Sequence, residues 1–224
     1  MNSGIIFDLD DTLCDTRGQL VMVAHREASE AMRKAGLHFS VDEILDKRLF
    51  HWKENPRGDI DLLTSESLGG GRGEAEAGRK AYLERPVGAL DPLPGAIPLL
   101  HALSSWKRAL VTRGSPITQG EKIKLLGFGS FFDSIHIVPS HLSKKGTYQE
   151  VVEEWGLPLS RVVVVGDRPD KDIEPARRLG LRTIRFLNGE FREVAPSRKS
   201  ERADAEVERL EEILPLLKEW LLTD

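Results

Sequence analysis

Three carboxylates and a threonine follow a short apolar run near the start of the chain. The run is Ile5–Phe7, and the polar residues behind it are Asp8, Asp10, Asp11 and Thr12. Such a run predicts a buried strand, and in an open parallel sheet ligands bind just beyond the carboxyl ends of the strands. Acids crowded there repel one another and resist desolvation unless a cation offsets their charge. A hard cation with oxygen ligands fits best, so the pattern predicts a Mg²⁺ site; the alternative is a simple turn cap.

A second predicted strand ends in a hydroxyl group. Thr112 closes the segment Arg108–Thr112, and Arg113 and Gly114 follow it in a turn that leads into a helix. A threonine hydroxyl with nearby backbone N–H groups suits the binding of phosphate oxygens. The alternative role for Thr112 is that of an N-cap of the next helix.

Four consecutive valines make the clearest strand of the chain. Val162–Val165 predict a central buried strand, and Gly166 and Asp167 lead from it into a loop that also holds Asp172. Asp167 is therefore a second candidate acid for the same cation.

Two adjacent lysines, Lys144 and Lys145, precede a predicted helix. A lysine brought to the strand ends would neutralise both a nucleophilic carboxylate and an incoming phosphate. Solvated surface lysines are the alternative interpretation.

Strands and helices alternate in the second half of the chain, which is typical of a parallel sheet with right-handed crossovers. We therefore predict an α/β fold, a Rossmann-like parallel sheet with helices on both faces. The predicted strands are Ile5–Phe7, Arg108–Thr112, Ser134–Val138, Val162–Gly166 and Arg182–Phe186. A surface loop is predicted over Glu190–Ala203. A last helix is predicted over Glu208–Leu222, with a kink at Pro215.

The stretch between the first two strands has a different character. Helical periodicity covers Arg17–Ala35, a capping box starts a helix at Ser40, and another helix is expected over Glu74–Glu84. The segment His51–Gly73 is rich in Gly, Asn and Pro, so we predict an irregular connector there. We predict a core domain of residues 1–15 and 92–224 and a small all-helical cap of residues 16–91, able to cover the site as a lid.

Composition narrows the class of protein further. The chain has 224 residues, 40% of them hydrophobic, and a net charge of −4 with both signs mixed, which argues against nucleic acid as a partner. No stretch is long and apolar enough for a membrane span. Cys14 is the only cysteine, so a reducing, cytoplasmic location is expected, and carboxylates near its thiol favour a packing role. The sequence predicts no particular oligomeric state.

Taken together, these residues resemble the haloacid dehalogenase-like superfamily, and the resemblance covers nearly the whole chain. The first family motif, D-x-D-x-T/V, matches Asp8–Thr12, and the second, a strand-ending Thr or Ser, matches Thr112. The third is a lysine, matched by Lys144 or Lys145. The fourth, G-D-x-x-x-x-D, matches Gly166–Asp172. Order and spacing agree, and the helical insert is similar to the C1-type cap of the family.

The resemblance implies a Mg²⁺-dependent phosphate monoester hydrolase that acts on a small phosphorylated metabolite through an aspartyl-phosphate. Asp8 would be the nucleophile, and Asp10 would protonate the leaving oxygen and later deprotonate water. Asp8, the backbone carbonyl of Asp10 and Asp167 would hold Mg²⁺. Thr112 and the lysine would bind the transferring oxygens, and Asp172 would steady the lysine or a metal-bound water.

Two positions depart from common family patterns. Many relatives have Lys-Pro where this chain has Lys144-Lys145, and we prefer Lys144 because Tyr148 follows it by four residues. Arg113 replaces a frequent Asn, which puts a fixed positive charge beside the presumed phosphate site, where it either contacts substrate or points to solvent.

Other activities of this superfamily, and one other class of domain, match these residues less well. Relatives that cleave carbon–halogen bonds lack a second Asp equivalent to Asp10, which makes a dehalogenase a poor match. A phosphosugar mutase commonly has Val or Ile in place of Thr12, and a phosphonatase needs a cap lysine that nothing here singles out. A receiver-type signalling domain has no place for the insert. A catalytically silent binding protein stays an alternative of another class, and the sequence leaves the substrate open among phosphoglycolate, sugar phosphates and nucleoside monophosphates.

Overall fold

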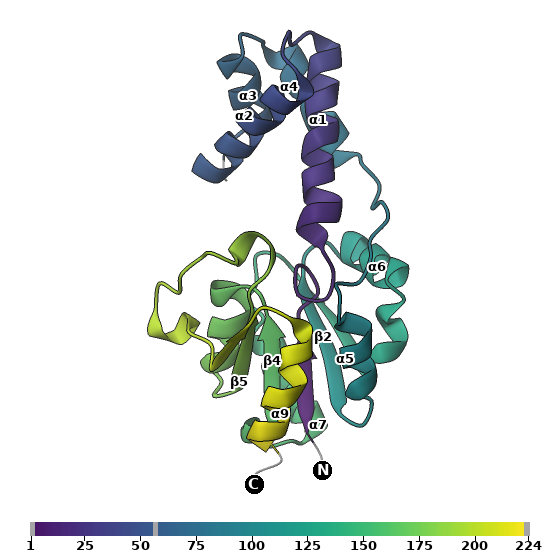
Figure 1. The fold of residues 1–224 in the computed structure, drawn as a ribbon, viewed down its shortest axis with the longest axis vertical. Coiled ribbons are helices and arrows are strands. Elements are labelled where there is room, and N and C mark those ends of the chain that lie inside the picture. Colours follow the sequence, from purple (N-terminus) through teal and green to yellow (C-terminus); the bar gives the residue numbers. More distant parts are fainter. Residues whose placement is uncertain (1–2, 56–57, 222–224) are drawn as a thin grey trace. The chain divides into compact units, whose positions relative to one another are not determined.

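A computed structural model describes residues 3–55 and 58–221 and divides the chain into two compact units (Figure 1). The core unit comprises Met1–Arg17 and Ala89–Asp224, and the helical unit comprises Gly18–Gly88. The core unit contains the sheet and the residues expected to do chemistry.

Six parallel strands form the sheet of the core unit, in the order β3-β2-β1-β4-β5-β6. The strands are β1 Gly4–Phe7, β2 Lys107–Arg113, β3 Ser134–Val138, β4 Val162–Gly166, β5 Arg182–Phe186 and β6 Ala205–Val207. β1 lies in the middle and pairs with β2 on one side and β4 on the other. Strand order reverses between β1 and β4, which is where an open sheet of this class binds its ligand. The predicted fold class is confirmed.

Helices cover both faces of this sheet. They are α5 Ala96–Ala102, α6 Pro116–Leu125, α7 Lys145–Trp155, α8 Glu174–Arg177 and α9 Ile213–Leu221. α5 and α9 lie in front of the strands in Figure 1, and α7 and α8 pack on the opposite face. The hydrophobic cluster under α7 and α8 joins strand residues to helix residues, among them Ile6, Val111, Val164, Tyr148, Val151 and Ala176. Burial of these side chains fixes the strands whose ends carry the polar residues.

Four helices make up the helical unit: α1 Met22–Ala35, α2 Val41–Glu54, α3 Ile60–Ser67 and α4 Arg72–Leu83. Gly36 caps the C-terminal end of α1, and its φ of 136° lies in the region that favours glycine. The predicted capping box is present, because Ser40 accepts from the Glu43 N–H while the Glu43 carboxylate accepts from the Ser40 N–H. Met32, Leu37 and Ile44 form the apolar cluster of the unit.

Three expectations about secondary structure were wrong. The segment His51–Gly73 is not irregular throughout, because α2 continues to Glu54 and α3 begins after Asp59, which accepts a hydrogen bond from the Leu62 N–H as an N-cap. β6 was missed, since three residues carry too little pattern to be recognised. The last helix was predicted to start at Glu208, but α9 begins at Ile213, so Pro215 lies in its first turn, where the missing backbone N–H breaks no intrahelical bond; a kink at Pro215 stays a prediction. The predicted end of this helix, Leu222, lies outside the described residues.

Across the described ranges, no helix combines the length and the apolar character that crossing a lipid bilayer requires.

Candidate active site

Three polar residues follow neighbouring strands at the carboxyl edge of the sheet. Asp8 comes directly after β1, Thr112 lies at the end of β2, and Asp167 comes directly after β4. The Asp8 N–H donates to the carbonyl of Val165 at 2.9 Å, which extends the β1–β4 pairing to the residue that carries the acid. Central strands therefore bring together side chains that are more than 150 residues apart.

The turn after β1 has an unusual backbone. Asp11 has a φ of 53°, the one positive φ outside glycine among the described residues. Its carboxylate accepts from the Arg17 N–H at 2.9 Å, and its carbonyl accepts from Asn188 Nδ2 at 3.0 Å. Asp tolerates this left-handed conformation better than most side chains. The two hydrogen bonds hold a turn that directs Asp8 and Asp10 toward the same cavity.

Lys144 joins two of the acids. Its Nζ lies 2.5 Å from Asp8 Oδ1 and 2.6 Å from Asp172 Oδ1, and all three side chains are buried. Lys145, the other candidate, has an exposed side chain at the start of α7. The geometry therefore distinguishes the two lysines, since Lys144 is the one beside the candidate nucleophile.

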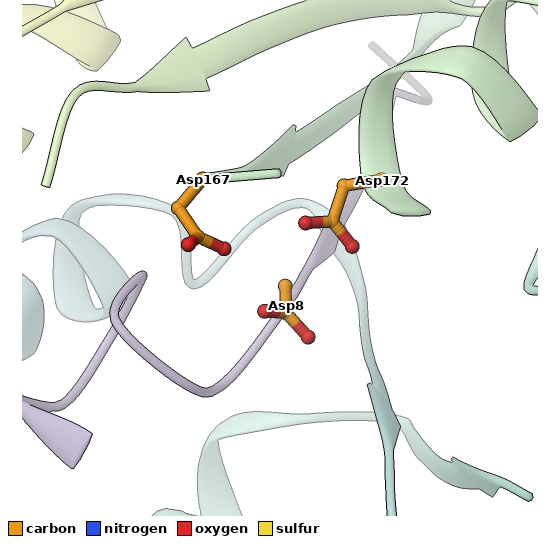
Figure 2. A group of neighbouring side chains, drawn as sticks. All are labelled: Asp8, Asp167 and Asp172. Atoms are coloured by element: carbon orange, nitrogen blue, oxygen red, sulfur yellow. The ribbon is translucent and has the colours of Figure 1, made fainter. Parts of the chain in front are cut away.

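Asp8, Asp167 and Asp172 form a compact group of carboxylates. Each offers an oxygen, and these oxygens lie within 4.8 Å of one another (Figure 2). Asp167 is 2% exposed, and its Oδ1 has no hydrogen-bond partner within the described part of the chain. A buried carboxylate oxygen without a partner is costly, which indicates that a group absent from the structure completes this site.

The carboxylate oxygens of this group differ in their hydrogen-bond partners. Asp172 uses both, one for Lys144 and the other for the Arg168 N–H at 3.0 Å. Asp8 uses Oδ1 for Lys144, and Asp167 Oδ1 is unused. Asp8 and Asp167 are thus the side chains most available to a divalent cation, and their oxygen donors suit a hard one. The carboxylate of Asp10 is not in this group; its expected metal ligand is the backbone carbonyl.

Burial and mutual repulsion change the protonation of these acids. Burial raises the pKa of Asp8 to about 7 against the opposing effect of Lys144, and Asp172 and Asp10 raise it further. Burial likewise raises the pKa of Asp167 well above the usual range, with Asp172 and Asp8 adding to the effect. Burial alone would lower the pKa of Lys144, but Asp172 and Asp8 hold it well above its ordinary value. The single lysine does not balance the acids around it.

Asp10 is held by three donors. Thr16 Oγ1 lies 2.5 Å and Lys122 Nζ 2.6 Å from Asp10 Oδ1, while Gln119 Nε2 lies 2.8 Å from Oδ2. Gln119 Nε2 also lies 2.5 Å from Thr112 Oγ1. Neither Gln119 nor Lys122 was predicted to belong to the site, although they are three residues apart on a predicted helix and therefore share one face.

Thr12 and Arg113 take different places around the site. Thr12 is fully buried, and its hydroxyl has no partner in the ranges that the structure describes. Arg113 is half-buried and lines the cavity at the carboxyl edge. That cavity measures about 160 Å³, which suits a phosphate group, and Asp8, Asp167 and Lys144 line it as well.

Cys14 has no part in this chemistry. Its thiol is buried, contacting the carbonyl of Leu9 at 3.6 Å and Thr16 Oγ1 at 3.5 Å. Burial raises the pKa of the thiol to about 12, with a further contribution from Asp10, so a thiolate nucleophile is disfavoured.

The chain is similar to known proteins over most of its length. A model of the haloacid dehalogenase-like hydrolase family matches residues 3–180. The glyceraldehyde 3-phosphate phosphatase of Methanocaldococcus jannaschii is 33% identical, over 97% of this chain and 98% of that relative. The enzyme of the same description from Methanopyrus kandleri is 31% identical, over 98% of both chains.

Solved structures agree with the fold. A putative beta-phosphoglucomutase from Thermotoga maritima superposes with a TM-score of 0.67 at 23% identity, covering 99% of this chain and 100% of that one. The putative HAD-hydrolase YfnB from Bacillus subtilis gives a TM-score of 0.66 at 19% identity, covering 96% and 98%. At these identities the likeness concerns the fold alone.

Proposed function

The chain belongs to the haloacid dehalogenase-like hydrolase family and is a phosphatase of a small phosphorylated metabolite, and we propose that it acts through Asp8 as a nucleophile with the help of Mg²⁺. The observation that carries this proposal is the buried position of Asp8 between Lys144 and two further acids. Nucleophilic catalysis divides a difficult hydrolysis into two easier steps.

In the first step the Asp8 carboxylate attacks phosphorus, and the bond from phosphorus to the leaving oxygen breaks. Asp10 gives its proton to that oxygen, so the alcohol leaves neutral and Asp8 carries the phosphoryl group. In the second step Asp10 takes a proton from a water molecule, which attacks the phosphorus and releases inorganic phosphate. Asp8 is then restored as a carboxylate.

Mg²⁺ fits the carboxylate oxygens described above, and Asp8 and Asp167 are the side chains that we expect to hold it, together with the backbone carbonyl of Asp10. When bound, the ion supplies positive charge that offsets the repulsion between a carboxylate and a phosphate. Asp172, with both oxygens occupied, is assigned to the support of Lys144.

The other residues of the edge bind and orient the phosphate. We assign the ammonium of Lys144 to the transferring oxygens, with Arg113 at the side of the cavity. Thr112 is fully buried, accepts a hydrogen bond from Gln119 Nε2 and is not among the described residues that line the cavity, so its hydroxyl would reach the phosphate only after a local rearrangement. Thr12 supports the turn that carries the acids. Preorganised donors of this kind act strongly in a buried site, because little water screens their charge.

The substrate class follows from the relatives. Two full-length relatives at about 30% identity carry the description glyceraldehyde 3-phosphate phosphatase, so a three-carbon phosphate such as glyceraldehyde 3-phosphate is our first candidate. We assign substrate selection to the helical cap, residues 16–91, and place the enzyme in the cytoplasm. The mutase and phosphonatase alternatives have no specific observation in their favour.

The test is phosphate release from glyceraldehyde 3-phosphate and a panel of small phosphoesters, with Mg²⁺ and after its removal by a chelator. We expect turnover only with Mg²⁺, and we expect Asp8→Asn to lower kcat by at least about 10⁴-fold. Rapid acid quenching should trap a phosphoryl group on the peptide that contains Asp8. The exposed Asp46 provides a control, since Asp46→Asn makes the same chemical change at a residue that is not among those lining the cavity.

Two results would contradict the proposal in different ways. Turnover that persists in Asp8→Asn would remove Asp8 as the nucleophile. No Mg²⁺-dependent turnover on any small phosphoester would instead favour a catalytically silent binding protein.

A further inference from the structure

Two side chains of helix α6 donate hydrogen bonds to the carboxylate of Asp10 at the carboxyl edge of the sheet. Lys122 Nζ lies 2.6 Å from Asp10 Oδ1 and Gln119 Nε2 lies 2.8 Å from Asp10 Oδ2. Gln119 and Lys122 are three residues apart on α6, so their side chains lie on the same face of the helix and both reach Asp10. The same amide of Gln119 reaches Thr112 Oγ1, and this connects Asp10 to the end of β2.

The burial of Lys122 makes its contact with Asp10 significant. Lys122 is 6% exposed and Gln119 is 2% exposed, so neither side chain can exchange its contacts freely for water. A buried ammonium is stable only when a negative group compensates it, and among the described residues Asp10 is the acid that forms an ion pair with Lys122. Asp10 itself keeps 30% of its side chain exposed and lines the cavity.

Lys122 lies outside the lining of the cavity in which we expect the substrate to bind. Among the described residues that line the cavity, neither Lys122 nor Gln119 is present, whereas Asp10 is. Any influence of Lys122 on the reaction therefore passes through the Asp10 carboxyl group. That makes Lys122 a residue that positions another, and not a catalytic residue.

We propose that Lys122 is a positioning residue for leaving-group protonation, because its ammonium fixes Oδ1 of Asp10 and leaves Oδ2 as the oxygen that exchanges a proton with the substrate. This inference rests on the proposed function, in which Asp10 is the acid of the first step. Gln119, which touches Oδ2, assists by holding that oxygen in line with Thr112.

The proton transfer concerned is the one in the first step of the proposed reaction, the attack of Asp8 on phosphorus. Oδ2 of Asp10 gives its proton to the leaving oxygen as the phosphorus–oxygen bond breaks and the bond to Asp8 forms. Lys122 keeps its own protons throughout and stays paired with Oδ1, so the carboxylate formed at Asp10 is compensated at once. Without Lys122, Asp10 would keep the hydroxyl of Thr16 on Oδ1 and the amide of Gln119 on Oδ2 but would lose its charge partner, so the carboxyl group would be held less firmly in the geometry on which proton transfer depends.

The leaving group gives the decisive experiment. An alkyl phosphate needs a proton on its departing oxygen, whereas acetyl phosphate releases acetate, which leaves without one. Since kcat/KM reports the steps through release of the leaving group, it isolates the contribution of Asp10 as an acid. We would measure kcat/KM of Lys122→Met for the preferred alkyl phosphate of the panel and for acetyl phosphate, both with Mg²⁺.

For the alkyl phosphate we expect kcat/KM to fall by about 10- to 100-fold, and for acetyl phosphate by less than about threefold. The ratio of the two values does not depend on the fraction of folded enzyme, because that fraction multiplies both. A partly unfolded variant is therefore still informative. Lys122→Arg, which keeps the charge, should restore most of the ratio, and Gln119→Leu should change it in the same direction by a smaller factor.

A matched control lies on the same helix. Lys124 is exposed, and Lys124→Met should leave both values unchanged. If Lys122→Met lowers kcat/KM for both substrates by one common factor, or lowers it for neither, Lys122 has no specific role in leaving-group protonation and the inference is overturned. If the wild-type protein hydrolyses neither substrate, the proposed function fails, and the inference fails with it.

Discussion

Each unit of this protein buries a cation against carboxylates, and the two clusters differ in their balance of charge. In the core unit Lys144 contacts Asp8 and Asp172, and Asp167 lies beside them. In the helical unit Arg48, 1% exposed, is paired with Asp61. The first cluster sets one cation against three acids, and the second sets one against one.

This difference separates a site that binds something from a pair that maintains a fold. Unbalanced buried charge raises the free energy of the folded state. Such a cluster is therefore expected where a bound ligand or metal ion compensates the excess charge. The core cluster also lines a cavity, as such a role requires. A balanced ion pair needs no further partner, and breaking it lowers the stability of the fold.

A histidine beside Arg48 extends the contrast. His25 is 1% exposed, and neither ring nitrogen has a hydrogen-bond partner among the residues described. Its ring packs at 4.9 Å from that of Trp52 and 5.1 Å from that of Tyr82. Burial, with a smaller effect from Arg48, lowers the pKa of His25 to about 4, so this cluster takes up no second positive charge.

The largest effect on stability is expected from breaking the balanced pair. Asp61→Asn leaves Arg48 buried without its charge partner, and we expect the free energy of unfolding to fall by about 3 kcal/mol. Asp8→Asn should not lower it, since it removes one of three crowded acids and leaves Lys144 paired with Asp172. Urea denaturation followed by circular dichroism measures both.

Asp42 is the matched control for this comparison, because its pair with Arg26 at 3.0 Å is exposed. Asp42→Asn should cost less than about 1 kcal/mol. Equal losses for Asp61→Asn and Asp42→Asn would show that burial does not distinguish the two pairs.

The second effect concerns the unbalanced cluster. A Mg²⁺ concentration of about 100 times its dissociation constant should stabilise the folded protein by about 2.7 kcal/mol, and Asp167→Asn should remove most of this gain. Protons compete with the metal, because burial raises the pKa of Asp8 to about 7. The gain should therefore increase between about pH 6 and about pH 8. Thermal unfolding with Mg²⁺ or with a chelator, in the absence of substrate, provides the measurement.

Asp170 lies in the same loop and is already paired with Arg168 and Lys171. Asp170→Asn should retain the Mg²⁺ effect. An unchanged shift in Asp167→Asn would mean that the unpaired oxygen described above is not a metal ligand.

The smallest effect is a pH dependence of the helical unit. Between about pH 6.5 and about pH 4 the unfolded chain protonates His25 while the folded chain keeps it neutral. The unfolded state binds the extra proton, so stability is full above this range and decreases as the pH falls through it. We expect the thermal midpoint of wild type to drop between pH 7 and pH 5 by more than that of His25→Phe.

His38 is exposed on the same unit, so His38→Asn should behave as wild type in this titration. A midpoint difference between wild type and His25→Phe that is independent of pH would contradict the assignment.

Much of the fold was readable from local patterns. The strands Ser134–Val138, Val162–Gly166 and Arg182–Phe186 have the predicted bounds, because short apolar runs flanked by turns mark buried parallel strands. The family resemblance, which was drawn from motifs at the ends of such strands, was confirmed by the family model and by the full-length relatives. α3 was missed because it is eight residues long and follows a stretch of Asn, Pro and Gly.

The residues that form the site were easier to predict from the sequence than the contacts between them. Asp8, Asp167 and Asp172 were named from sequence, and Lys144 was preferred over Lys145 because of its spacing from Tyr148; the ion pair with Asp8 adds the contact that the spacing alone did not give. Lys122 lies 112 residues from Asp10, and only the crossover through α6 brings them together. Motifs identify the groups that react, whereas the groups that orient them come from tertiary structure.

The central position of β1 has a consequence for how the enzyme acquires activity. β1 precedes the other strands, but its partners β2 and β4 begin at Lys107 and Val162, so it has both of its neighbours only after the β4 segment has been made. Contacts of such long sequence separation form late and slowly. We therefore expect nascent chains that end before Val162 to carry the nucleophile and to have no active site.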